Sequence, residues 1–221
     1  MNVRYRDPQE LPDTIPVFPL AGALLLPRAQ MPLNIFEPRY LAMTDDAMKG
    51  ARLIGMIQPD DSKAASAAGP AIYATGCAGR ITQYAESGDG RYLITLTGVS
   101  RFRVREELSV TTPYRQCRVD FAAFKDDLVP RFGEEAVDRE QLLQTLRDYL
   151  KANDLQADWQ DINQAPTEAL VNGLAMMSPY GAREKQALLE APDLKSRAEV
   201  LIALTEMALA KTDGDNDLPM Q

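Results

Sequence analysis

The hydrophobic pattern of this sequence changes character near residue 128. Before that point, short segments such as 99–105 and 117–121 alternate between apolar and polar residues, a period of two that favours β-strands. After it, apolar residues recur every three or four positions, as in 134–153 and 194–211, which favours amphipathic helices. A run of strands followed by a run of helices predicts an α+β fold.

The strand patterns of the first part follow one another at spacings of about 8–12 residues, which favours a small closed or half-closed β-barrel. We therefore predict a β-barrel subdomain at 1–127, with one short helix that Pro38 begins. An α-helical bundle is predicted at 128–212 and a disordered acidic tail at 213–221. A chain of this length buries a core without help from a metal or a disulfide.

The sequence contains no histidine. This excludes Ser-His and Cys-His nucleophiles and every histidine-ligated metal site. It also lacks the glycine-rich phosphate loop of ATPases. Cys77 and Cys117 lie too far apart in the sequence for a metal-ligand pair, so we interpret them as buried, reduced thiols of a cytoplasmic protein. We predict a protein with no cofactor, no metal and no enzymatic activity.

The charge balance bears on the class of partner. Lysine and arginine number 24 against 32 aspartate and glutamate residues, a net charge of −8. This balance opposes nucleic acid or an anionic membrane as the main partner. No apolar run approaches the ~20 residues that span a bilayer, and the first ten residues lack the apolar core of a signal peptide.

A connection bounded by prolines supplies the candidate binding surface. Leu24, Leu25 and Leu26 precede Pro27, and Met31 precedes a second proline. Apolar residues in such a connection are hard to bury completely, so we predict an exposed apolar patch that contacts a polypeptide. The candidate peptide-binding residues are the apolar Phe18, Leu25, Leu26, Met31 and Tyr40, together with the orienting cations Arg28 and Arg39. Phe18 and Tyr40 also fit a barrel core, as do Phe36 and Phe102.

Several of these segments resemble the amino-terminal domain of Lon proteases. The resemblance is carried by IPVFPL at 15–20 and MPLNIFEPRY at 31–40, followed in the same order by segments 73–81, 98–104 and 185–190. It extends from about Ile15 to about Leu209 and implies a PUA-like β-barrel followed by a helical bundle. It also implies a role in recognising protein substrates. Arg28 stands where the family often has glycine.

The resemblance, together with the missing catalytic motifs, implies a stand-alone, non-catalytic module that binds unfolded or apolar polypeptide segments. A separate protease or chaperone is a further candidate partner, and the Leu24–Met31 segment is equally a candidate for a weak homodimer contact. Two alternatives remain open. One is RNA binding through Arg101, Arg103 and Arg105, and the other is hydrolysis by a Ser-Lys pair, either Ser62 with Lys63 or Ser196 with Lys195.

Overall fold

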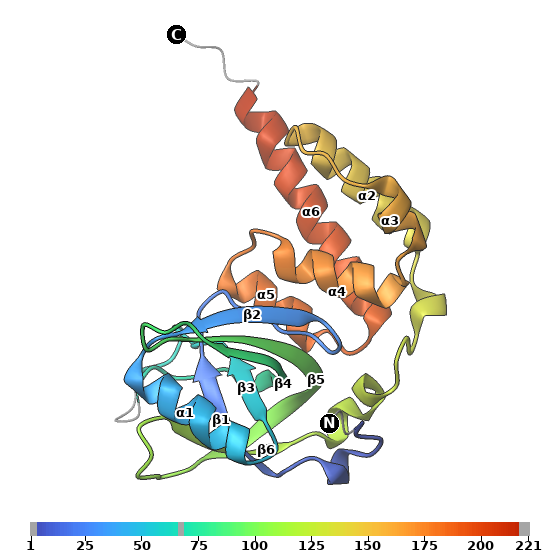
Figure 1. Ribbon diagram of the computed structural model, residues 1–221. Helices are drawn as coiled ribbons and strands as arrows, with labels where there is room; N and C mark the ends of the chain where they lie inside the picture. Colours follow the sequence, from blue (N-terminus) through green and yellow to red (C-terminus); the bar gives the residue numbers. More distant parts are fainter. Residues whose placement is uncertain (1–3, 66–68, 217–221) are drawn as a thin grey trace. The chain divides into compact units, whose positions relative to one another are not determined.

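The computed structural model describes residues 4–65 and 69–216, with side chains described up to residue 210 (Figure 1). The chain forms two compact units. The first comprises Met1–Pro130 and Tyr180–Leu189, and the second comprises Arg131–Pro179 and Glu190–Gln221. The chain thus leaves the first unit, builds most of the second, returns for one helix and then completes the second.

The first unit is built on a six-stranded sheet in the order β2-β5-β4-β3-β1-β6. Its strands are β1 (Thr14–Pro19), β2 (Gln30–Ile35), β3 (Leu53–Ile57), β4 (Thr75–Glu86), β5 (Tyr92–Glu107) and β6 (Arg115–Asp120). Only β1 and β3 pair in parallel. Because β6 also pairs with β5, five strands close into a ring, and β2 lies outside it. The predicted α+β class is confirmed, although the sheet is not a simple barrel.

The long strand β5 pairs with two different strands along one edge. Its first part, 92–97, pairs with β2, whereas 103–107 pairs with β6. Gly98 lies between these two stretches. A Cβ atom at Gly98 would lie far inside van der Waals contact with the carbonyl oxygen of Leu26. The close approach of these two backbones therefore requires glycine, and it places the segment before β2 against the middle of β5.

The core of the first unit follows the alternation that the sequence shows. Phe102 is fully buried and belongs to one cluster with Ile15, Val17, Cys117 and Val119. In the sequence, both faces of 92–97 carry apolar or β-forming residues, which is typical of a central strand. The structure confirms this position, since β5 has neighbours on both sides.

Helix α1 (Pro38–Lys49) begins at Pro38 and buries Tyr40, Met43 and Ala47 on one face. Both features match the sequence pattern, because proline suits the first helical turn and the three residues lie three or four positions apart.

One helix departs from the predicted arrangement. Residues 128–212 are predicted to form a single bundle, but α5 (Ala182–Glu190) belongs to the first unit. The reason is a set of buried amides. Gln58 Nε2 donates to the Ala182 carbonyl at 2.9 Å and to Gln186 Oε1 at 3.2 Å, and Gln186 Nε2 donates to the Thr75 carbonyl at 3.2 Å. Buried amides of this kind need partners, and α5 supplies them.

The second unit consists of helices. They are η3 (Glu134–Ala136), α2 (Arg139–Ala152), α3 (Trp159–Gln164), α4 (Thr167–Met177) and α6 (Leu194–Asn216). Both α2 and α4 pack against α6. Asp193 caps the start of α6, since its carboxylate accepts the N–H of Ser196 at 2.7 Å. The acidic tail was predicted from residue 213, but α6 continues to Asn216; residues 217–221 lie outside the described part.

Two 3₁₀ helices complete the first unit, η1 (Pro8–Glu10) and η2 (Ala122–Leu128). They contact each other, and η2 also packs on β5. Helix η2 therefore lies against β5, the same strand that pairs with β2 and with β6.

Candidate functional site

The apolar patch predicted at Leu24–Leu26 is wrong as an exposed surface. Leu24, Leu25 and Leu26 are 2%, 1% and 0% exposed and belong to the core. Their burial is possible because the backbone polar groups of the connection find partners. The N–H of Arg28 donates to the Gly98 carbonyl at 2.8 Å, and the N–H of Ala29 donates to the Leu26 carbonyl at 3.2 Å. These hydrogen bonds give partners to backbone groups of the proline-bounded connection where it enters the protein.

The two aromatic candidates are also inaccessible. Phe18 and Tyr40 are each 7% exposed, and their ring centroids lie 4.0 Å apart. Both side chains belong to the core, as the sequence also allowed.

Of the three remaining candidates, only Arg39 lies beside the aromatic pair, with its guanidinium 4.5 Å from the centre of the Tyr40 ring. The Arg28 guanidinium donates to the backbone carbonyl of Asp127, and Arg28 has a φ of 65°, in the left-handed region that favours glycine. Arg39 is exposed and pairs with Glu37 at 2.8 Å. Met31 is half-buried on β2. The structure thus does not gather the seven predicted residues into one surface, and a binding role for Met31 or Arg39 stays a prediction.

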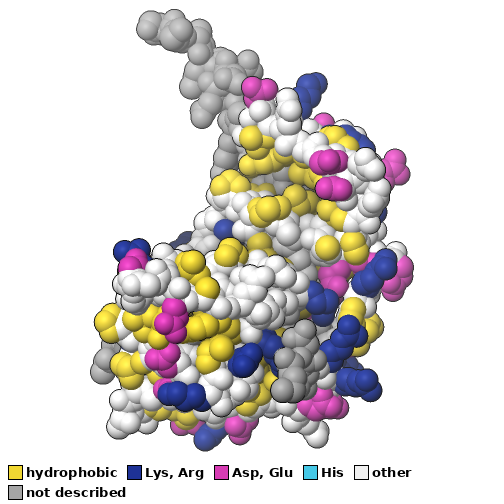
Figure 2. Space-filling view, in the orientation of Figure 1, with side chains coloured by type: hydrophobic (Ala, Val, Ile, Leu, Met, Phe, Trp, Pro, Cys, Tyr) yellow, Lys and Arg dark blue, Asp and Glu magenta, His cyan; other side chains and the backbone are white. Residues whose placement is uncertain are grey.

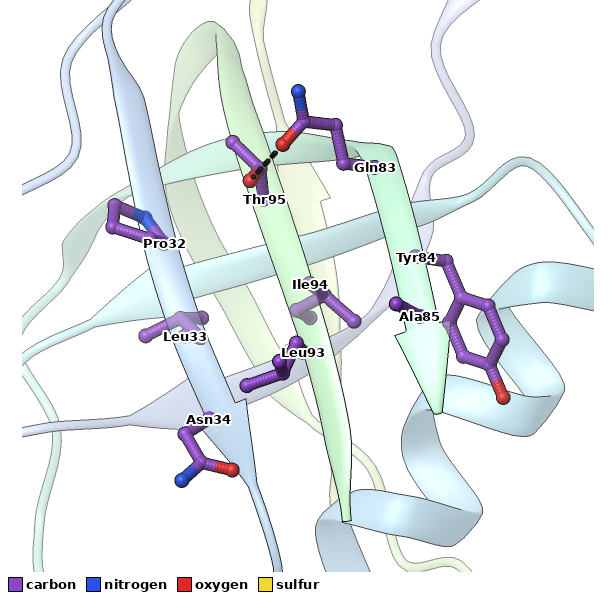
Figure 3. A pocket seen from close by; sticks show the side chains of 9 residues that line it. All are labelled: Pro32, Leu33, Asn34, Gln83, Tyr84, Ala85, Leu93, Ile94 and Thr95. Carbon is purple, nitrogen blue, oxygen red and sulfur yellow. Dashed lines mark hydrogen bonds between the residues drawn. The ribbon is translucent and has the colours of Figure 1, made fainter. Parts of the chain in front are cut away.

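An apolar surface does exist on strands β2, β5 and β4. Where β4 runs past its pairing with β3, these three strands form an extension of the sheet whose outer side chains remain exposed (Figure 3). It carries a shallow hollow of about 480 Å³, which we call the outer hollow. Its lining residues are Pro32, Leu33, Asn34, Gln83, Tyr84, Ala85, Leu93, Ile94 and Thr95.

Leu93 is the central apolar residue of the outer hollow. It is 50% exposed and lies opposite Asn34 on β2 and Ala85 on β4. Phe36, directly after β2, is 60% exposed and has the same strand parity as Pro32 and Asn34. On the face shown in Figure 2, hydrophobic side chains reach the surface over the sheet of the first unit.

Some of the polar groups around the outer hollow have side-chain hydrogen-bond partners. Thr95 Oγ1 donates to Gln83 Oε1 at 2.9 Å (Figure 3). The phenol of Tyr84 donates to Glu86 at 3.0 Å, and burial, together with this hydrogen bond, raises the pKa of Tyr84. The phenol therefore stays neutral at ordinary pH. None of the residues that line the hollow is charged.

Sequence reasoning missed Leu93 and Phe36. In the sequence, Phe36 fits a barrel core, and both faces of 92–97 carry apolar or β-forming residues. The available signal was the parity of the strands. Leu93 alternates with Thr95 and Thr97 on one face of β5, and Phe36 follows Gln30 and Asn34 on the exposed positions of β2.

The structure removes the support for a Ser-Lys pair. Asp60 accepts hydrogen bonds from Ser62 Oγ at 2.5 Å and pairs with Lys63 at 2.8 Å. Because Asp60 holds the ammonium, the pKa of Lys63 is raised, and a protonated lysine cannot act as a base. Lys195 faces Glu199, with a nitrogen–oxygen distance of 3.8 Å.

The arginine residues predicted to form one exposed row are divided. Arg101 is 4% exposed and paired with Asp127 at 2.8 Å, whereas Arg105 pairs with Asp120. The exposed Arg103 lies 5.9 Å from the ring of Phe124. Two of the three arginine side chains that an RNA phosphate would need are thus already paired with carboxylates.

Within residues 4–65 and 69–216, no group of three or more histidine, cysteine, aspartate or glutamate residues is placed to hold a metal ion. Over the same residues, no helix has the length and apolar character needed to cross a membrane.

Comparison with known proteins identifies the family. Residues 14–206 match the family described as the ATP-dependent protease La (LON) substrate-binding domain. Lon protease 2 of Myxococcus xanthus is 26% identical over 203 residues, which cover 89% of this chain and 24% of the relative. Lon protease of Desulfosudis oleivorans is 31% identical over 106 residues, 48% of this chain and 13% of the relative. The chain spans about a quarter of the length of the first of these relatives.

Two solved structures share the fold. The crystal structure of a Lon N-terminal domain protein from Xanthomonas campestris has a TM-score of 0.62 at 24% identity, covering 86% of this chain and 97% of that one. The N-terminal domain of the Mycobacterium avium complex Lon protease has a TM-score of 0.63 at 19% identity, covering 87% and 98%. These structures show a shared fold, and the family match over 14–206 shows that the chain belongs to the Lon substrate-binding domain family.

Proposed function

We propose that this chain is a non-catalytic module that binds apolar segments of unfolded polypeptides at the outer hollow. The observation that carries the proposal is Leu93, a half-exposed leucine near the start of the central strand β5. Exposed apolar side chains that gather on a surface mark contact sites for other molecules, and the family is described as substrate-binding.

The expected affinity follows from the size of the surface. Covering a side chain such as Leu93 or Phe36 contributes about 1.5–3 kcal/mol when it is fully exposed beforehand, and less here because both are already partly covered. Ordering the bound segment opposes this gain. A few such contacts predict dissociation constants in the micromolar range. Because the lining residues are uncharged, binding should depend little on salt, in contrast to RNA binding.

Fluorescence anisotropy tests the proposal. The probe is reduced, carboxymethylated α-lactalbumin carrying a fluorophore, a chain that stays unfolded. We expect saturable micromolar binding that folded α-lactalbumin does not compete with. Leu93→Ser should weaken binding about tenfold, which is about 1.4 kcal/mol, with little change in melting temperature. The matched control is Val110→Ser, which changes a 39% exposed valine outside the hollow and should leave binding unchanged.

Two results would contradict the proposal. An absence of binding at high micromolar concentration would remove polypeptide recognition as the function. Equal binding by Leu93→Ser and the unsubstituted protein would place the site away from the outer hollow.

The remaining parts of the proposal concern activity and setting. The purified chain should not hydrolyse casein, because Ser62 and Ser196 each lack a lysine base in the geometry above. A separate protease or chaperone that receives the bound polypeptide, and a cytoplasmic location consistent with two free cysteines, belong to the same proposal.

A further inference from the structure

Strand β2 presents an open backbone edge. It is the terminal strand of the sheet order, and among the described residues only β5 pairs with it. The Ala29 carbonyl accepts the N–H of Gly98 at 2.9 Å, and the register continues through Met31 opposite Leu96. In an antiparallel ladder, alternate residues direct their N–H and carbonyl groups to the same neighbour. Odd-numbered residues of β2 therefore face β5, and even-numbered ones face away.

The position of Pro32 fits this alternation of backbone groups along β2. Proline has no N–H, so it fits a position whose backbone nitrogen faces away from the neighbouring strand. Gln30, Pro32 and Asn34 are all exposed. The free edge thus offers the N–H groups of Gln30 and Asn34 and the carbonyls of all three residues.

The edge is only lightly protected against pairing. Proteins usually block such edges with charged side chains, prolines, bulges or a covering segment. From Gln30 to Phe36 there is no charged residue, and Pro32 is the only protective feature in the strand. Pro32 and Asn34 also line the outer hollow, so an added strand would continue the same apolar face.

We infer that a polypeptide segment bound at the outer hollow is extended and adds to β2 as a further strand of the sheet. Its alternate N–H groups donate to the carbonyls of Gln30, Pro32 and Asn34. Side chains on one of its faces lie beside those of Pro32 and Asn34, and Leu93 lies one strand further in. This inference rests on the proposed function and specifies the conformation of the ligand, by the general mode in which a peptide completes a sheet edge.

An unfolded client fits this edge better than a second copy of the chain. A client strand without proline loses a single hydrogen bond, the one that Pro32 cannot donate. Two antiparallel β2 strands centred on Pro32 would lose two, because each proline lacks its N–H. The edge therefore selects a foreign, proline-free strand over self-pairing.

N-methylation of the ligand tests the inference. Overlapping 12-residue peptides from α-lactalbumin are screened by anisotropy against the full chain, and the tightest binder is methylated at one backbone nitrogen at a time. Each methyl group removes one N–H and leaves the side chain in place. We expect affinity losses of about fivefold, roughly 1 kcal/mol, at every second residue of the bound stretch. Intervening positions should change little.

A variant of the edge provides the matched test on the protein. Asn34→Pro removes an outward N–H, whereas Asn34→Ala keeps that N–H and shortens the side chain. We expect the proline variant alone to weaken binding of the unmethylated peptide, with circular dichroism and melting temperature confirming that both variants are folded. If Asn34→Pro fails to fold, the methylation series decides.

The outcomes separate this inference from the proposed function. Peptide binding that depends on Leu93 but shows no two-residue pattern would overturn the added strand and leave the binding proposal standing. Absence of any peptide binding would overturn both. Self-association that Asn34→Pro abolishes and that excludes the peptide would show that a second copy occupies the edge, against the inference.

Discussion

Asp127 holds the guanidinium and the backbone of Arg101 at the same time. Asp127 Oδ2 accepts from the Arg101 N–H at 2.9 Å and from Nε at 2.8 Å, and Oδ1 accepts from Nη2 at 2.8 Å. Arg101 Nη1 also donates to the Leu189 carbonyl at 3.1 Å. One buried ion pair therefore joins β5, η2 and α5 within the first unit.

Replacing Asp127 by Ala should destabilise the protein strongly. The Arg101 side chain is 5% exposed, and removing one partner of a buried pair leaves an uncompensated charge, at a cost of about 3–5 kcal/mol. Urea unfolding measures the loss. Glu106→Ala is the control, because Glu106 and Arg118 form an exposed pair at 2.9 Å worth about 0–1 kcal/mol. Equal effects of the two changes would contradict the role of the buried pair.

Replacing Leu26 by Ala should lower stability rather than affinity. Leu26 is fully buried, and truncating a buried leucine to alanine costs about 2–5 kcal/mol. A fall in melting temperature, with polypeptide binding retained below that temperature, is the expected result. An unchanged melting temperature with lost binding would restore the exposed patch that the sequence suggested.

Two glycine-to-alanine changes should act in opposite directions. Gly98→Ala places a methyl group against the Leu26 backbone, and backbone atoms cannot move aside cheaply, so we expect a large loss of stability or no soluble protein. Gly173→Ala lies within α4, where a Cβ meets nothing within 4 Å. Alanine in a helix interior is favoured over glycine by about 0.5–1 kcal/mol. Thermal unfolding of both variants checks the contrast, and a destabilised Gly173→Ala would contradict it.

Asp60 should contribute a pH-dependent part of the stability. Hydrogen bonds from Lys63 and Ser62 lower the pKa of Asp60. A group whose pKa is lower in the folded state stabilises the fold above its unfolded pKa, about 3.9, and loses this effect as the pH falls through the folded value. The unsubstituted protein should therefore exceed Asp60→Asn in urea midpoint at about pH 7, and the difference should shrink below about pH 4. A pH-independent gap would contradict this.

Both thiols should resist modification in the folded protein. Cys77 and Cys117 are 1% and 0% exposed, and burial raises the pKa of Cys117 to about 11. Reaction requires an accessible thiolate. At about pH 8, near the ordinary thiol pKa, Ellman's reagent should react slowly with the native protein and rapidly after addition of urea. Fast reaction of either cysteine in the native protein would show that the first unit opens.

Local sequence rules predicted the features that depend on neighbouring residues. The helix that Pro38 begins and the helical pattern over 194–211 depend only on residues within one or two turns of each other. The alternation that buries Phe102 needs only the two-residue period of a strand.

The features that the sequence did not predict depend on distant partners. Leu26 is buried because Gly98 lets its backbone approach, and α5 joins the first unit because Gln58 and Gln186, 128 positions apart, satisfy each other. Leu93 is exposed on the extension of the sheet, where β4 and β5 continue to pair beyond the last residue of β4 that pairs with β3. A one-dimensional pattern shows which face of a strand is apolar but not whether another element covers it.

The return of α5 to the first unit bears on how this protein can be divided. A fragment that stops at Pro130, the end of the first stretch of that unit, would lack the carbonyl of Leu189 that Arg101 uses and the amide of Gln186 that Gln58 uses. Separating the units therefore takes two cuts and a new linkage across residues 131–179. The same arrangement affects folding during synthesis, because the first unit cannot be completed until residue 189 has left the exit tunnel of the ribosome.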